Sequence, residues 1–148
     1  MNSFTLLLLS VAVGVMVVIQ GGLNAQLGVL LKNPLLATSA ALTVSALLTV
    51  TAVLLTVKQL PTSQVLRTIP AYLWVTGAAF SFLAVTLFYY LIPKLGISTA
   101  VSFGLFGQIA FSMVAAHFGW FGLPEETIVW RKVLGVATMI IGLYLIKF

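Results

Sequence analysis

Residues 4–31 have the sequence FTLLLLSVAVGVMVVIQGGLNAQLGVLL, a run of 28 residues without a charged side chain. A helix needs about 20 mostly apolar residues to cross the hydrocarbon core of a bilayer. An isolated strand in lipid would leave its backbone N–H and C=O groups without partners, so this run is expected to form a membrane-spanning helix. At about 1.5 Å per residue it would be roughly 42 Å long, which exceeds the hydrocarbon core and indicates a tilt, a bend or an overhang.

Four further apolar runs follow when the chain is divided at its prolines and charged residues. They lie at 35–56, 71–92, 97–118 and 127–148, and the purely apolar part of the last begins only at Val133. We therefore predict an all-α integral membrane protein in which residues 1–148 form one membrane domain with five transmembrane helices. A four-span chain with an unusual first segment is the alternative count.

The breaks between the runs have recognisable turn chemistry. Pro34 is expected at the first position of the second helix, because proline there loses no intrahelical hydrogen bond. Residues 93–96 (Pro-Lys-Leu-Gly) predict a tight turn between an antiparallel pair, and residues 61–67 predict a short interfacial turn. Residues 124–126 (Pro-Glu-Glu) are expected to begin the fifth helix, with the two carboxylates near its positive dipole end.

The composition excludes several classes of protein. The 148 residues are 61% hydrophobic and 6% charged, whereas soluble domains are about 45–50% apolar and about 25% charged. A soluble enzyme and a disordered linker are therefore excluded. The net charge of +5 comes from seven basic residues scattered between apolar runs, so no basic stripe is available for nucleic acid and no nucleic-acid partner is expected. The absence of cysteine removes disulfides and thiolate metal sites.

The loop charges bear on topology. With five spans the two termini lie on opposite sides of the membrane; the N-terminal side then holds Lys58, Arg67, Arg131 and Lys132, and the other side holds Lys32, Lys94 and Lys147. Four against three is almost no asymmetry for the positive-inside rule, so insertion in both orientations is a candidate. Two oppositely inserted copies would form an antiparallel homodimer of ten helices, equivalent to the inverted repeat of many transporters. A single orientation set during insertion is the alternative.

Uncharged amides lie well inside two of the predicted spans, the first and the fourth. Gln20 and Asn24 lie four residues apart, hence on one helical face, and Gln108 lies near the centre of the fourth span, one turn before Ser112. Amides at this depth need partners and face the bundle interior or a hydrated cavity. They either hold helices together or line a substrate path. The second interpretation makes four residues substrate-binding candidates: Gln20, Asn24, Gln108 and Ser112.

Small residues suggest further roles. The pair Gly21-Gly22 permits a bend and is the candidate helix hinge. Gly14, Gly21 and Gly28 belong to a row of small residues on the first helix, and small residues let membrane helices approach closely. Three small residues on the last helix are candidates for dimer packing: Gly135, Thr138 and Gly142.

Few side chains could transfer protons or catalyse a reaction. His117 is the one residue in or beside a span that titrates near neutral pH, which makes it the candidate for proton coupling. It lies nine residues after Gln108, on the opposite side of the helix. The sequence has no Asp, and its two Glu residues, Glu125 and Glu126, lie outside the apolar runs. An embedded carboxylate for organic cations is therefore missing, and we expect no enzymatic activity, metal or cofactor.

Several segments resemble one known family. They are residues 20–28 (QGGLNAQLG), 33–35 (NPL), 104–108 (GLFGQ), 117–122 (HFGWFG) and 131–135 (RKVLG). Together they are similar to the YdcZ family of small bacterial inner-membrane proteins, over nearly the whole chain. The resemblance implies membership of the drug/metabolite transporter superfamily, whose ten-helix members look like duplicated five-helix units. It also implies export of a small molecule, without naming the molecule.

Two details of the resemblance concern mechanism. Ala116 occupies the place before His-Phe-Gly where relatives often carry an acidic residue, so the resemblance supplies no acid for proton coupling here. The spacing of Gly135 and Gly142 resembles the glycine heptad in the last helix of small multidrug resistance proteins, which implies a dimer contact.

The resulting hypothesis is a multi-pass exporter of the bacterial inner membrane that works by alternating access as an antiparallel dual-topology homodimer. Its partners would be membrane lipid, a small-molecule substrate and a second copy of the chain. The alternative is a non-transporting membrane subunit whose small-residue helix faces serve assembly with another protein.

Overall fold

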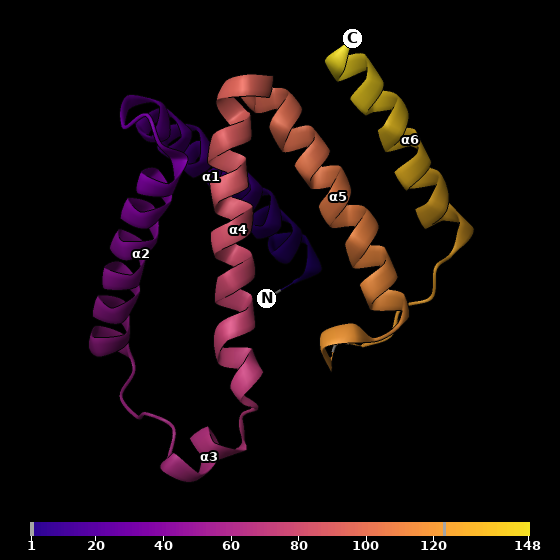
Figure 1. Ribbon diagram of the computed structural model, residues 1–148. Coiled ribbons are helices and arrows are strands. Elements are labelled where there is room, and N and C mark those ends of the chain that lie inside the picture. The colour runs from indigo at the N-terminus through magenta and orange to yellow at the C-terminus, as the bar shows by residue number, and fades with distance from the viewer. Residues whose placement is uncertain (1, 123) are drawn as a thin grey trace. The chain divides into compact units, whose positions relative to one another are not determined.

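The computed structural model describes residues 2–122 and 124–148, which form helices and no strand (Figure 1). The elements are α1 (Ser3–Leu30), α2 (Pro34–Thr56), α3 (Ser63–Thr68), α4 (Ala71–Leu95), α5 (Ile97–His117), the 3-10 helix η1 (Trp120–Gly122) and α6 (Trp130–Lys147). Within the described residues, four helices are long and apolar enough to cross a membrane: α1, α2, α4 and α5. The prediction of an all-α membrane protein is confirmed, while the fifth span is not. The chain divides into two compact units, Met1–Lys94 and Leu95–Phe148.

The observed start of α2 agrees with the prediction, whereas the observed end of α4 does not. Pro34 lies in the first turn of α2, as predicted, and the Asn33 side chain accepts a hydrogen bond from the Leu35 N–H as its N-cap. The prediction that the third span ends at residue 92 is wrong, because α4 continues through Pro93 to Leu95. A proline in the last turn removes only one helical hydrogen bond. The helix ends where Gly96 adopts a φ of 82°, a conformation that glycine tolerates.

The prediction that residues 124–126 begin the last helix is also wrong. The segment 124–129 is non-helical, and α6 begins only at Trp130 rather than at 127. The Glu126 N–H instead donates a hydrogen bond of 2.9 Å to the Ala116 carbonyl in the last turn of α5. Carbonyl groups at a helix end have no intrahelical partner, so this bond holds the connecting segment against α5. Helix α6 therefore begins later in the sequence than predicted.

The turn between α1 and α2 ends α1 with a Schellman motif. The Asn33 N–H donates to the Gly28 carbonyl and the Lys32 N–H donates to the Val29 carbonyl, both at 3.0 Å. Lys32 occupies the position where helices usually place glycine and has a φ of 53°. A residue with a Cβ is strained in this left-handed conformation.

Replacing Lys32 therefore separates backbone strain from charge. Both Lys32→Gly and Lys32→Ala remove the ammonium group, but only glycine relieves the strain. We expect Lys32→Gly to be more stable than Lys32→Ala by about 1 kcal/mol. Unfolding of the purified variants in detergent, followed by circular dichroism, measures the difference. Equal stability would show that the turn does not constrain residue 32.

Small residues form the helix contacts of the first unit. Gly21, Ala25 and Gly28 are the buried residues of α1. A Cβ built on Gly28 would lie 3.4 Å from the Pro34 Cα and 3.5 Å from the Ala37 Cβ, so α1 and the start of α2 are in close contact. Because lipid supplies no hydrophobic force between membrane helices, such close packing is what holds them together.

A pair of hydroxyl groups links α2 to α4. The Thr38 side chain, which is 1% exposed, donates to the Pro34 carbonyl at 3.0 Å. Its oxygen lies 3.1 Å from the Thr86 hydroxyl, within hydrogen-bond distance. Hydrogen bonds between membrane helices are worth about 0.6 kcal/mol on average, so this contact orients α2 on α4 more than it stabilises the pair.

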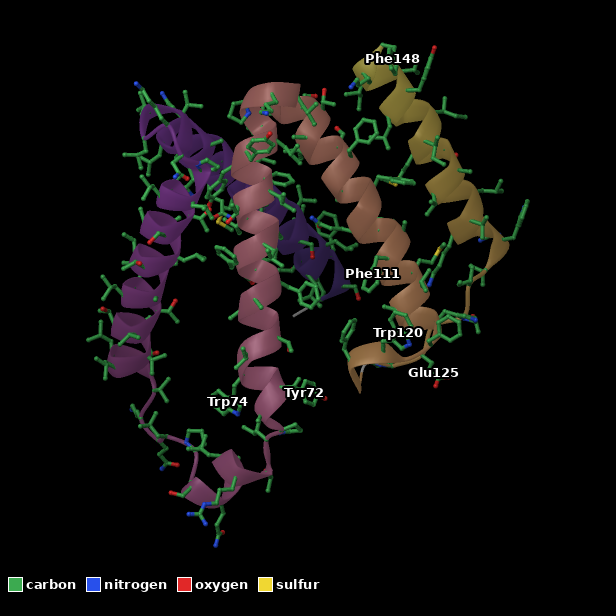
Figure 2. The ribbon with its side chains drawn as sticks, in the orientation of Figure 1. Tyr72, Trp74, Phe111, Trp120, Glu125 and Phe148 are labelled. Atoms are coloured by element: carbon green, nitrogen blue, oxygen red, sulfur yellow. The ribbon has the colours of Figure 1, made fainter. Side chains whose placement is uncertain are left out.

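In the second unit, α5 and α6 lie side by side (Figure 1). Ala115 of α5 and Leu143 of α6 are buried. After α5, the η1 segment brings the ring of Trp120 within 6.0 Å of Phe111, centroid to centroid, and Figure 2 shows these two side chains close together. The chain between the two helices is thus folded back on the end of α5.

Candidate functional site

A groove of about 340 Å³ lies between α1 and α2. Its α1 side is formed by Gln20, Asn24 and Leu27, and its α2 side by Ala40, Ala41, Val44 and Ser45. The two amides share the groove because they are one helical turn apart, as predicted. The alanines and the serine of α2 are short, which leaves the space in front of the amides open.

Asn24 links the lining of the groove to α4. Its side-chain Nδ2 donates a hydrogen bond of 2.9 Å to the Tyr89 hydroxyl of α4, and Tyr89 is only 4% exposed. The bond leaves one N–H and the amide oxygen of Asn24 available. Asn24 therefore both connects two helices and faces the groove, while the exposed side chain of Gln20 has no hydrogen-bond partner among the described residues.

Tyr89 is the site residue that the sequence analysis missed. A position near a span end is typical of an aromatic residue of the membrane interface; Figure 2 shows two other aromatic residues, Tyr72 and Trp74, at the start of α4. The Tyr89 hydroxyl instead accepts the hydrogen bond from Asn24 of α1. The spacing of Thr86 and Tyr89 could have indicated this role, because residues three apart lie on one face of a helix. In the structure both side chains form polar contacts with another helix.

The second unit has its own groove, of about 500 Å³, between α5 and α6. Ser112 and Ala116 line it from α5, and Lys132, Gly135 and other residues line it from α6. The Ser112 hydroxyl donates to the Ile109 carbonyl of its own helix at 2.9 Å, and Gln108 is exposed on α5. The structure thus brings Gln20 and Asn24 together in one unit and places Gln108 and Ser112 in the other.

One ion pair lies beside the α5–α6 groove. The Lys132 ammonium is 2.6 Å from a Glu126 carboxylate oxygen. This hydrogen bond and the positive charge of Lys132 hold the pKa of Glu126 below its usual range. Both side chains are substantially exposed, so the pair contributes little to stability. His117, at the end of α5, packs edge-on against Phe118 with ring centroids 5.0 Å apart, and its role in proton coupling stays a prediction.

The predicted hinge and dimer glycines have different surroundings. Helix α1 continues through Gly21 and Gly22 without a break, and a Cβ on Gly21 would be 3.5 Å from Ile92 of α4. Nothing lies within 4 Å of a Cβ built on Gly135 or Gly142, so the face of α6 with these glycines is open, and at Gly135 it borders the α5–α6 groove. Thr138 donates to the Leu134 carbonyl of α6. Bending of α1 and dimer contacts of α6 stay predictions.

The sequence matches the model of a known protein family. A family model described as "Putative inner membrane exporter, YdcZ" matches residues 5–145. The chain belongs to the YdcZ family. The match includes nearly all of α1, with Gln20 and Asn24, and the greater part of α6, so the resemblance inferred from short segments is confirmed.

YdcZ membership agrees with the four apolar helices in describing a multi-pass protein of the inner membrane, surrounded by lipid. The family description names a transporter class rather than an enzyme class, and it supports export of a small molecule. No curated protein and no solved structure matches the chain.

Proposed function

We propose that this YdcZ family member exports a small molecule by alternating access, as an antiparallel dual-topology homodimer. The observation that carries the proposal is the α1–α2 groove, where Gln20 and Asn24 face open space in a chain built from apolar helices. A polar side chain in a lipid environment is costly unless it serves a cavity or a partner. The groove supplies such a cavity, and a solute would supply hydrogen-bond partners.

The bound solute would meet uncharged groups. The proposed substrate-binding residues are Gln20, Asn24, Gln108 and Ser112, with Gly21-Gly22 as the hinge and His117 as the proton-linked group. Amides and hydroxyls both donate and accept hydrogen bonds, and the four apolar helices contain no carboxylate side chain. This chemistry suits a neutral, zwitterionic or anionic solute better than an organic cation.

A fifth span is part of the proposal. Helix α6 has 18 residues and carries Arg131, Lys132 and Lys147 near its ends. Its apolar centre, residues 133–146, is about 21 Å long at about 1.5 Å per residue. Lysine and arginine side chains extend toward the headgroups from such positions, and local thinning of the bilayer accommodates a short span. The odd number of spans then makes oppositely oriented copies the way to build a ten-helix transporter.

The open face of α6 supports a contact between two copies. Gly135, Thr138 and Gly142 follow one another at steps of three and four residues, and the space beside both glycines is unfilled. A helix from a second copy can approach closely at such a face. Alternating access would then be a rocking of one copy against the other.

Dual topology predicts reporter signals on both sides of the membrane. A C-terminal reporter that is active only in the cytoplasm and one active only outside it should both give signal, because the loop charges are nearly balanced. Removing Lys32 and Lys94 together should shift the population toward one orientation. Signal from one side only, in all of these proteins, would exclude the antiparallel dimer.

Transport is tested with liposomes that contain only the purified protein. Loss of a metabolite from a loaded mixture, measured by mass spectrometry, would support export, and comparison with Gln20→Leu assigns it to the groove. If the protein moves nothing while its variants change its assembly with another membrane protein, the non-transporting subunit is the better hypothesis.

A further inference from the structure

A pocket with almost wholly apolar walls, bordered by two lysine residues, lies where three distant segments of the first unit meet. The end of α1, the start of α2 and the last turn of α4 border an open pocket of about 190 Å³. A water molecule occupies about 30 Å³ of liquid volume, so the space has room for part of a lipid molecule. The residues that matter for its chemistry are Lys32, Asn33, Tyr90 and Lys94, with Val29 and Pro93 as apolar wall.

The two lysines give this pocket its charge. Lys32 and Lys94 are 62 positions apart in the sequence, and the fold places both in its lining. The Lys94 ammonium donates to the Tyr90 hydroxyl and lies 4.0 Å from the centroid of the Tyr90 ring. It keeps further N–H donors, and the tyrosine, which accepts this bond, keeps its own O–H to donate. Two ammonium groups and one hydroxyl thus belong to residues that border the pocket.

The positive charge of the pocket is not neutralised within the first unit. The sequence of Met1–Lys94 contains no Asp and no Glu, so the counter-charge must come from outside the unit. The pocket lies at the ends of α1, α2 and α4, all of which are long and apolar enough to span the membrane. At that depth the phosphates of lipid headgroups are the most concentrated anions.

We infer that this pocket binds the phosphate of an anionic phospholipid. The ammonium groups of Lys32 and Lys94 and the hydroxyl of Tyr90 contact the phosphate oxygens, and the lipid glycerol and chains continue along Val29 and Pro93. The combination of apolar walls with bordering lysines favours a lipid over a free phosphate ion, because a free ion gains nothing from the apolar walls. The lipid joins α1, α2 and α4 at one membrane surface, independently of any transported solute.

Binding of short-chain lipids to the purified protein in detergent tests the inference. Dioctanoyl phosphatidylglycerol should raise the melting temperature in a saturable way, and dioctanoyl phosphatidylcholine should do so much less. In the double variant Lys32→Gln/Lys94→Gln the dissociation constant for phosphatidylglycerol should rise about 30-fold. This combines the loss of two lysines, each of which alone should raise the dissociation constant by about tenfold or less. The matched variant Lys58→Gln/Lys147→Gln has the same net charge and should bind like the wild type.

Several results would overturn the inference. One is equal binding by the two double variants, which would show general attraction to positive charge. Another is an equal effect of inorganic phosphate at the same concentration, which would make the pocket a soluble-anion site. A salt titration of the wild-type protein needs no variant: binding must weaken as salt screens the lysines, and salt-independent binding contradicts the proposed contacts.

Discussion

Gly28→Leu is expected to disrupt the first unit, whereas Gly14→Leu is expected to leave it folded. A Cβ at residue 28 would already be in van der Waals contact, 3.4 Å from the Pro34 Cα and 3.5 Å from the Ala37 Cβ. The remaining atoms of a leucine side chain would therefore meet backbone that cannot move without separating α1 from α2. Overpacking of this kind typically destabilises by about 1–3 kcal/mol.

The control separates packing from helix propensity. Leucine favours a helix over glycine by about 0.8–1.0 kcal/mol, so the same substitution at an open position should be neutral or stabilising. Gly14 is such a position, since nothing lies within 4 Å of a Cβ built there. It also lies in α1, fourteen residues before Gly28. Unfolding in detergent, followed by circular dichroism and gel filtration, should therefore show a loss of stability for Gly28→Leu and no loss for Gly14→Leu. Equal losses would mean that the α1–α2 contact is not the one that holds the unit together.

Local sequence patterns predicted the elements of this fold more reliably than their ends. Pro34 marks the start of α2 because its ring geometry and missing N–H fit the first turn of a helix. Pro93 was misleading for the same local reason: a proline is tolerated in the last turn of α4, and the helix ends at Gly96 instead. The start of α6 depends on the bond from Glu126 to Ala116, a contact between residues ten apart that no periodicity encodes.

For the candidate site, the sequence indicated which residues share a helix face, and their role in binding a solute stays a prediction. The four-residue spacing of Gln20 and Asn24 placed both amides on one face, and the structure puts both in one groove. Their different partners could not be predicted, because the bond from Asn24 to Tyr89 joins residues 65 positions apart. That bond makes Asn24 a poor probe of transport, since its replacement changes both the groove and a helix contact. Gln20 is the better probe.

Gln20→Leu is expected to reduce solute efflux by about tenfold or more while the protein stays folded. A solute group left without its hydrogen-bond partner in the site loses about 1–3 kcal/mol of interaction, and about 1.4 kcal/mol corresponds to a factor of ten. Leucine suits a helix in lipid at least as well as glutamine, and Gln20 forms no hydrogen bond within the described chain. Stability should therefore be unchanged or slightly higher.

Gln26→Leu is the matched control, because it makes the same chemical change on the same helix. Six residues at 100° each turn residue 26 by 240° from residue 20, away from the groove, and Gln26 is not part of the groove lining. Its efflux from liposomes should equal that of the wild type at equal protein content. If both variants lose efflux equally, the amides act through the helix or the membrane rather than through a solute. If neither loses it while the wild type transports, the path lies elsewhere, because a solute that passed the α1–α2 groove would have to meet the side chain of residue 20.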